Sequence, residues 1–198
     1  MSDRSGTQKI RSAMPLSLPS LARPDGDNFG GLLALQIFKA SHVVRIPDHD
    51  GVILPESLQM QSGITLAGLY FTPGTASFSE DAAETDQGDL YKWKLAFSVP
   101  KLAPDIHYWL QAQRGYDLMA IVLDGNRNSL LIGNSNYPLT LKADLDTGNK
   151  PSARNAYSFT LTGESPNPAL FYLMFESALP PPRKVFSSGF SFGFLRIP

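Results

Sequence analysis

The chain has 198 residues, a formal net charge of −1 and a pI of about 6.3, and this balance gives no electrostatic argument for binding nucleic acid or an anionic membrane. It contains no cysteine, which excludes disulfides, thiolate chemistry and cysteine-based zinc sites. Charged residues make up 18% of the chain, below the ~25% typical of soluble domains, so we expect partners to cover part of the surface.

We expect neither a membrane anchor nor a secretory signal peptide. No apolar run approaches the ~20 residues of a membrane span. The apolar stretch after Arg11 is too short for a signal peptide and is broken by Pro15 and Pro19. Residues 1–30 carry serine, proline, glycine and mixed charge without periodicity, which predicts an extended N-terminal arm that lies on its own domain or on a partner.

The next part of the chain predicts short strands and one long loop. Strands are expected at residues 32–38, 42–46 and 64–71, with residues 52–54 pairing back on the strand before them. Residues 73–89 are rich in small and acidic side chains and predict a loop of unusual length, which in a compact domain is usually functional or ordered by a neighbour. We therefore assign this loop to assembly, with Phe78, Glu80 and Asp81 as candidate contact residues.

Residues 91–99 give the clearest strand pattern. One face carries only apolar and aromatic side chains, which are Tyr91, Trp93, Leu95, Phe97 and Val99. Residues 104–114 then predict a short helix, because Pro104 suits its first position, Asp105 complements its dipole and Gly115 suits the C′ position. The apolar face of this helix is expected to lie on the sheet that contains residues 118–123.

Residues 117–175 form the most informative stretch. Strands at 118–123 and 129–132 are joined by the tight-turn sequence Asp124-Gly125-Asn126. Residues 138–145 and 157–162 alternate and predict half-buried strands, whereas the unbroken apolar runs 118–123 and 170–175 predict strands covered on both faces. The sequence thus predicts a mainly β domain over residues 31–179, a β-sandwich or barrel with one short flanking helix.

Residues 180–198 predict a C-terminal arm. Pro180, Pro181 and Pro182 favour a stiff, extended spacer. Beyond them Phe190, Phe192 and Phe194 alternate with small residues, a strand pattern with one apolar face. We expect this strand to dock on a neighbouring subunit or to fold back as the last strand of its own sandwich.

The sequence carries no pattern that points to catalysis or metal binding. His49 lies between Asp48 and Asp50 but lacks a second histidine at useful spacing, so a solvated turn explains it better. Asp124 begins a run similar to a calcium loop, yet serines stand where such a loop needs Gly and Glu, and a hairpin turn is the simpler interpretation. The acids of the 73–89 loop lack a rigid setting, and most of the aromatic content is expected to be packing. We therefore expect no enzyme activity, no cofactor and no metal site.

The segment from 91 to 172 resembles structural proteins of tailed phages and phage-tail-like particles. The likeness rests on turn and strand signatures, including Val99-Pro100 before the helix, Asp124-Gly125-Asn126, Leu131-Ile132-Gly133, Tyr137-Pro138-Leu139 and Thr160-x-Thr162-Gly163. It implies a tail-tube, tail-completion or neck-ring subunit of a virion assembled in the host cytoplasm. The implied partners are copies of the chain in a ring or tube and other virion structural proteins, with no membrane and no sequence-specific nucleic acid. The alternative is a carbohydrate- or receptor-binding β-sandwich module, because Trp93, Tyr108 and Trp109 could stack on a sugar.

Overall fold

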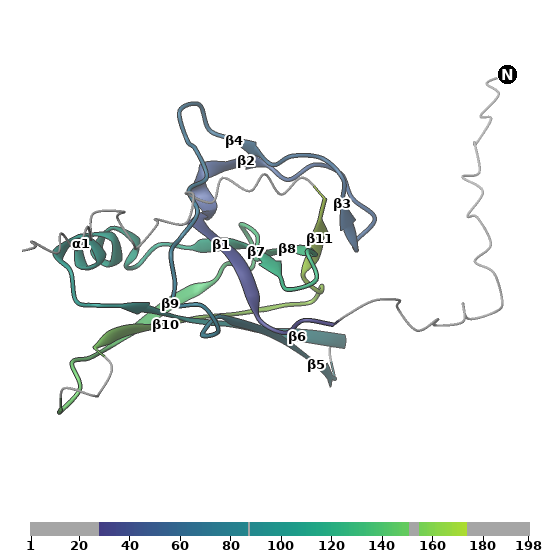
Figure 1. Ribbon diagram of the computed structural model, residues 1–198. Coiled ribbons are helices and arrows are strands. Elements are labelled where there is room, and N and C mark those ends of the chain that lie inside the picture. The colour runs from purple at the N-terminus through teal and green to yellow at the C-terminus, as the bar shows by residue number, and fades with distance from the viewer. Residues whose placement is uncertain (1–27, 87, 151–154, 174–198) are drawn as a thin grey trace, which may run out of the picture.

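The computed structural model describes residues 28–86, 88–150 and 155–173, and Figure 1 shows their arrangement. They form eleven strands, one short 3-10 helix (Ala40–His42) and one α-helix, α1 (Pro104–Gln113). The strands are β1 (Leu32–Lys39), β2 (Val43–Arg45), β3 (Ile53–Leu54), β4 (Gln59–Met60), β5 (Ser77–Thr85), β6 (Gly88–Pro100), β7 (Leu118–Asp124), β8 (Ser129–Ile132), β9 (Thr140–Asp146), β10 (Ala156–Ser165) and β11 (Leu170–Tyr172).

Two sheets pack face to face, which confirms the predicted mainly β sandwich with one short helix. The five-stranded sheet has the order β1-β7-β8-β11-β3, and the four-stranded sheet has the order β5-β6-β10-β9. In Figure 1 the five-stranded sheet forms the middle layer and the four-stranded sheet the layer below it. The small β2-β4 ribbon lies above both.

The first core fills the space between the two sheets. The predicted inward face of β6 supplies Trp93, Leu95 and Phe97, all at most 3% exposed. Across the β6–β10 ladder, Phe97 pairs with Phe159 and their rings stack with centroids 4.9 Å apart. The side chains that the period-two alternation predicted to face inward are therefore the buried ones, because only one face of this sheet packs against the other sheet.

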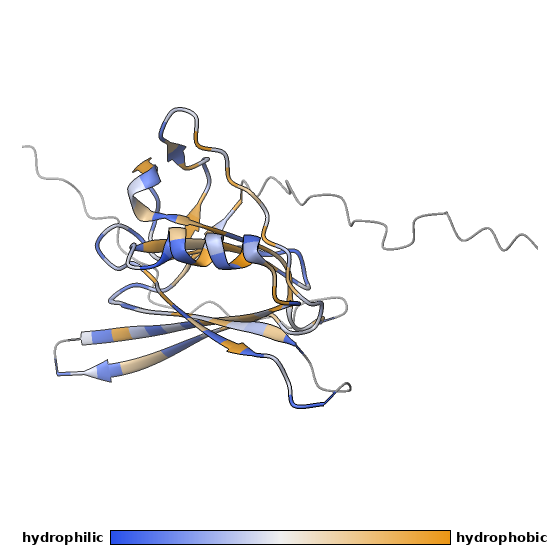
Figure 2. Cartoon of the chain, turned by 90° about the vertical axis from the view of Figure 1, so that its left-hand side faces the viewer, coloured by the Kyte–Doolittle hydropathy of each residue, from blue (hydrophilic) through white to orange (hydrophobic). Residues whose placement is uncertain are grey.

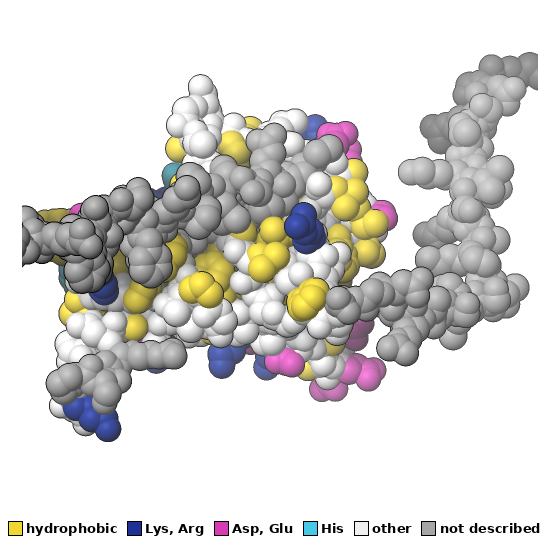
Figure 3. Space-filling model, viewed as in Figure 1, with side chains coloured by type: hydrophobic (Ala, Val, Ile, Leu, Met, Phe, Trp, Pro, Cys, Tyr) yellow, Lys and Arg dark blue, Asp and Glu magenta, His cyan; other side chains and the backbone are white. Residues whose placement is uncertain are grey.

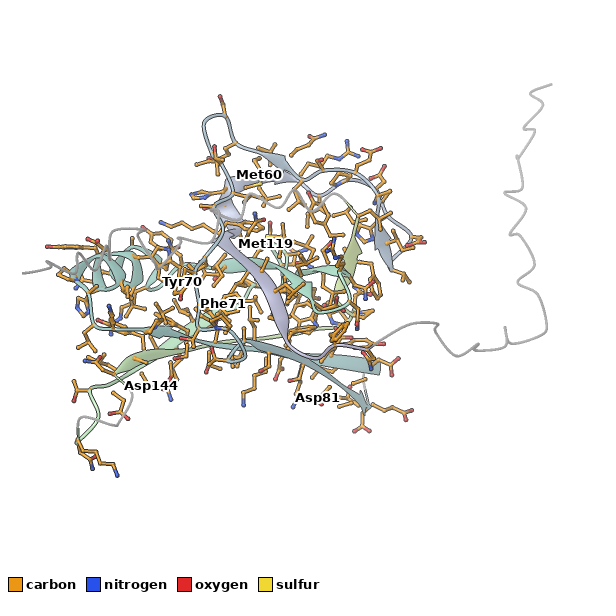
Figure 4. All side chains as sticks on the ribbon, viewed as in Figure 1. Met60, Tyr70, Phe71, Asp81, Met119 and Asp144 are labelled. Atoms are coloured by element: carbon orange, nitrogen blue, oxygen red, sulfur yellow. The ribbon has the colours of Figure 1, made fainter. Side chains whose placement is uncertain are left out.

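The central strand β7 is buried on both faces, as its unbroken apolar run predicted. Ala120 and Val122 face the first core, whereas Met119 and Ile121 belong to a second core on the opposite side of the sheet. All four are 0% exposed. The segment that carries the β2-β4 ribbon covers the second core, and Figure 4 shows Met60 in that ribbon above Met119.

Helix α1 begins at Pro104 and ends at Gln113, with Gly115 at a φ of +76° just beyond it, as predicted. Its inward face is half-buried against the first core through Ile106, Trp109 and Leu110. The Trp109 ring meets the Phe159 ring edge-on at 5.8 Å, so the helix contacts β10 of the four-stranded sheet. Figure 2 shows the helix turning its apolar side toward the sheets.

Three predicted local structures are wrong. Residues 64–71 form no ladder strand: a single bridge joins Gly68 to Gln36 on the edge of β1 that β7 leaves free, and Gly68 weakens a strand because it has no side chain to pack. β3 does not pair back on β2 but lies parallel to β11, and β2 pairs with β4. Phe171 in the run 170–175 is 42% exposed, so β11 is not covered on both faces.

The predicted long loop over 73–89 is also wrong. β5 occupies its centre and forms nine antiparallel pairs with β6, from Ser77 with Ala96 to Thr85 with Gly88. Few of its side chains are apolar, so local composition gave a loop signal. Cross-strand pairing with the strongly patterned β6 decides the conformation.

Candidate assembly surface

The β5–β6 hairpin projects beyond the body of the sandwich (Figure 2). Neither core includes a described residue between Ala83 and Leu90. Exposed acids crowd this part, namely Asp81, Glu84, Asp86 and Asp89. Figure 3 shows acidic side chains gathered at the end of the molecule where β5 and β6 project in Figure 1.

Glu80 ties the base of this hairpin to the rest of the domain. Its Oε2 accepts a hydrogen bond from the Trp93 indole at 2.7 Å and another from the Ala169 backbone N–H, also at 2.7 Å. Trp93 is 3% exposed, so its N–H needs a partner inside the protein. The carboxylate therefore links three segments, the hairpin's two strands and the approach to β11.

The four edges of the two packed sheets differ in how they are protected. On the five-stranded sheet, the β1 edge is partly covered, since the Leu69 N–H donates to the Leu35 carbonyl at 2.8 Å. At the other edge, β11 donates to Val52 and Leu54, so the backbone of Ile53 faces outward. The Ile53 N–H donates to Oδ1 of Asp50 at 2.8 Å, which caps this two-residue edge strand.

The four-stranded sheet ends in long strands on both sides. Within residues 28–86, 88–150 and 155–173, β5 and β9 each pair on one side only. Their open edges present rows of backbone donors and acceptors to a further strand. β5 shows no register shift against β6 and contains neither proline nor lysine, so its only features of the kind that discourage strand addition are the acids Glu80, Asp81 and Glu84.

The two open edges differ in charge. β5 carries Glu80, Asp81 and Glu84 and no basic residue. β9 carries Lys142 beside Asp144 on the same face, and Lys142 Nζ lies 4.0 Å from the Asp144 carboxylate. The β5 edge therefore favours a basic partner, whereas the β9 edge has no such preference. Figure 4 shows Asp81 and Asp144 near opposite ends of this sheet.

An apolar groove of about 580 Å³ lies at the helix end of the sandwich. It runs between residues 67–70 and α1, with Trp109 and Phe159 among its lining side chains. Tyr70 is 64% exposed, on the side of the molecule that carries α1 (Figure 4). The lining offers aromatic surface to an apolar or ring-shaped ligand but brings only one carboxylate, that of Asp105.

The side chains considered as metal ligands accept hydrogen bonds from the backbone of their own turns. Oδ1 of Asp124 accepts the N–H groups of Asn126 and Asn128 at 2.9 and 2.7 Å, which confirms the hairpin-turn interpretation. His49 Nδ1 accepts the Gly51 N–H at 3.1 Å, as in a local turn. No group of three or more potential metal ligands occurs in the described part of the chain.

Asp50 has the one resolved pKa shift among the described residues. Hydrogen bonds from the Ile53 N–H and then the Val52 N–H hold the pKa of its carboxyl below the ordinary value, and His49 adds a small favourable charge. The carboxylate is fully exposed, so the shift reflects the turn and not a buried reactive site.

The predicted assembly residues differ in their exposure and in their contacts. Phe78 is half-buried against the first core, Glu80 bonds within the domain and Asp81 is exposed opposite Lys92. The predicted arm residues lie outside the described residues, namely Pro180, Pro181, Pro182, Phe190, Phe192 and Phe194. Of the proposed sugar-stacking residues, Trp93 is buried in the core while Tyr108 is 72% exposed.

Sequence reasoning missed the open β5 edge and the groove. No local signal could have found the edge, because the strand itself was not predicted. Tyr70 stood in a segment expected to be a strand, and its apolar neighbours gave no sign of a groove.

The α-helix α1 has ten residues, and no helix in the described part of the chain is long and apolar enough to cross a membrane. Comparison with protein families, curated proteins and solved structures finds no match for this chain.

Proposed function

We propose that this chain is a non-enzymatic structural subunit of a phage virion or phage-tail-like particle, as a tail-tube, tail-completion or neck-ring component. The observation that carries the proposal is the nine-residue strand β5, whose outer edge pairs with no described strand, on a hairpin that projects from the body. An unprotected edge of this length is an aggregation hazard unless something pairs with it. We infer the kind of particle from the resemblance of residues 91–172 to phage structural proteins.

The test is the state of assembly of the full chain. We expect masses in solution at multiples of 21.6 kDa, with rings or tubes visible by electron microscopy, and co-sedimentation with particles when expressed beside its genomic neighbours. A monomer at every concentration that also fails to enter any particle would overturn the proposal.

A second candidate function rests on the groove beside α1. Tyr70 and Trp109 give it aromatic walls, which favours a carbohydrate- or receptor-binding module. Glycan-array binding that is lost in both Tyr70→Ala and Trp109→Ala, while the free energy of unfolding of Tyr70→Ala is unchanged, would favour this alternative. Tyr108→Ala is the matched control, since Tyr108 is exposed and does not line this groove.

A further inference from the structure

The β5 edge is acidic, and the C-terminal segment of the chain is basic. After Glu176 the sequence contains no acid, and its three charged residues are Arg183, Lys184 and Arg196. These bracket residues 186–195, a ten-residue segment close in length to the nine residues of β5. Length and charge therefore match the segment to this edge and not to β9, which carries a lysine.

The faces match as well. On β5, Phe78 lies on the face that packs against the first core, whereas Ser79 and Asp81 lie on the outer face. In residues 186–195, Phe190, Phe192 and Phe194 share one face, and the opposite face has small residues. A strand added beside β5 would continue the core face with phenylalanines and the outer face with serine and glycine.

We propose that the open edge of β5 accepts residues 186–195 of a second copy of this chain as an added strand. The inference rests on the proposed function, since it names the partner of that assembly surface. A row of strand exchanges from copy to copy is a heterologous contact, which closes into rings or extends into tubes.

The choice of a second copy over the chain's own edge rests on the proposed assembly. Ala169 lies at Glu80 of the hairpin base, and from there β11 runs away from β5 within the other sheet (Figure 1). Residues 174–185 span up to about 40 Å when extended, and the stiff Pro180, Pro181 and Pro182 favour an extended path that can reach a neighbouring copy.

The absence of cysteine makes disulfide trapping a clean test. Ser191→Cys is combined in the full chain with Ser77→Cys, Ser79→Cys or Asp81→Cys, three outer-face positions that sample the unknown register. Because a disulfide needs Cα atoms within about 7 Å, only directly neighbouring strands can be bridged. We expect at least one pair to give a ladder of covalent dimers, trimers and larger species on non-reducing electrophoresis.

The matched control is Ser191→Cys with Lys94→Cys. Lys94 lies on the same outer face but on β6, with Ser79 of β5 between it and the edge, so no ladder is expected. Charge gives a second readout: Glu84→Lys should lower the yield of the ladder about threefold, and Lys184→Glu in the same chain should restore it.

Each other outcome overturns the inference. Covalent dimers from Ser191→Cys alone would mean that C-terminal segments pair with one another. A disulfide confined to monomers would mean that the segment folds back on its own edge. If the full chain assembles but no β5 position is trapped, strand exchange is wrong while the proposed function stands. If the chain is monomeric in solution and enters no particle, the proposed function itself fails.

Discussion

Glu80 shows how one acidic side chain on a projecting strand can hold its own domain together. Its carboxylate satisfies the buried Trp93 indole and the Ala169 N–H at the same time. A hydrogen bond to a charged group is worth about 1.5–3 kcal/mol, more than a neutral one. The residue was proposed as an assembly contact, and its bonds within the domain are sufficient to explain its position.

Replacing Glu80 by alanine should lower the free energy of unfolding by about 2 kcal/mol, because it leaves the Trp93 N–H buried without its acceptor. Denaturant unfolding followed by tryptophan fluorescence measures the change. Glu80→Gln keeps an acceptor oxygen and should lose less. No measurable loss in Glu80→Ala would show that these hydrogen bonds do not stabilise the fold.

Asp50 should titrate below the ordinary aspartate pKa of about 3.9. A carboxyl whose pKa is lower in the folded state stabilises the fold above the unfolded pKa, and this contribution is lost as the pH falls through the folded pKa. Carboxyl carbon shifts in an NMR titration report the midpoint, and the Val52 and Ile53 amide shifts should follow it. In Asp50→Asn that pH dependence should disappear, and a midpoint at or above 3.9 in the wild type would contradict the assignment.

At the scale of elements, the projecting part of the β5–β6 hairpin lies outside both cores. Apolar contacts stabilise the base of the hairpin at Phe78 and Trp93, whereas its tip has cross-strand pairing and a hydrogen bond from the Thr85 hydroxyl to the Gly88 carbonyl at 2.6 Å. The tip can therefore change without a loss of core burial.

Replacing residues 83–90 by an Asn-Gly turn should leave the unfolding free energy within about 1 kcal/mol of the wild type and reduce assembly. Analytical ultracentrifugation and thermal unfolding measure the two effects. A variant that assembles as well as the wild type would show that the projecting tip makes no intersubunit contact. Deletion of the whole of β5 is not an equivalent test, since it removes Phe78 from the first core.

At the scale of the whole molecule, the described residues of both cores all precede the C-terminal segment. The first core lies between the two sheets and the second lies beneath the β2-β4 ribbon. Removal of the last nineteen residues therefore takes no described side chain from either core.

Truncation after Leu179 should give a folded, soluble product that does not assemble. Circular dichroism and light scattering test fold and mass together. An unfolded product would instead place the strand around Phe190, Phe192 and Phe194 in the subunit's own core. A product that still forms rings would move assembly to another surface.

The sequence by itself determined the elements whose patterns are local. The alternation in β6 and β10, the unbroken run in β7 and the proline and glycine at the ends of α1 each occur within a few residues. Such patterns report which face of an element is buried, so the fold class and the members of the first core that lie on β6, β7 and β10 followed from them.

Only the tertiary structure decided which strands pair and which edges stay open. β5 becomes a strand because β6 offers it a ladder, and β3 pairs with β11, more than a hundred residues away. Residues 64–71 have a strand-like composition but gain only a single bridge to the free edge of β1, at Gly68. Backbone pairing is long-range and nearly independent of side-chain identity, so the open edge of β5 could not be read from local sequence.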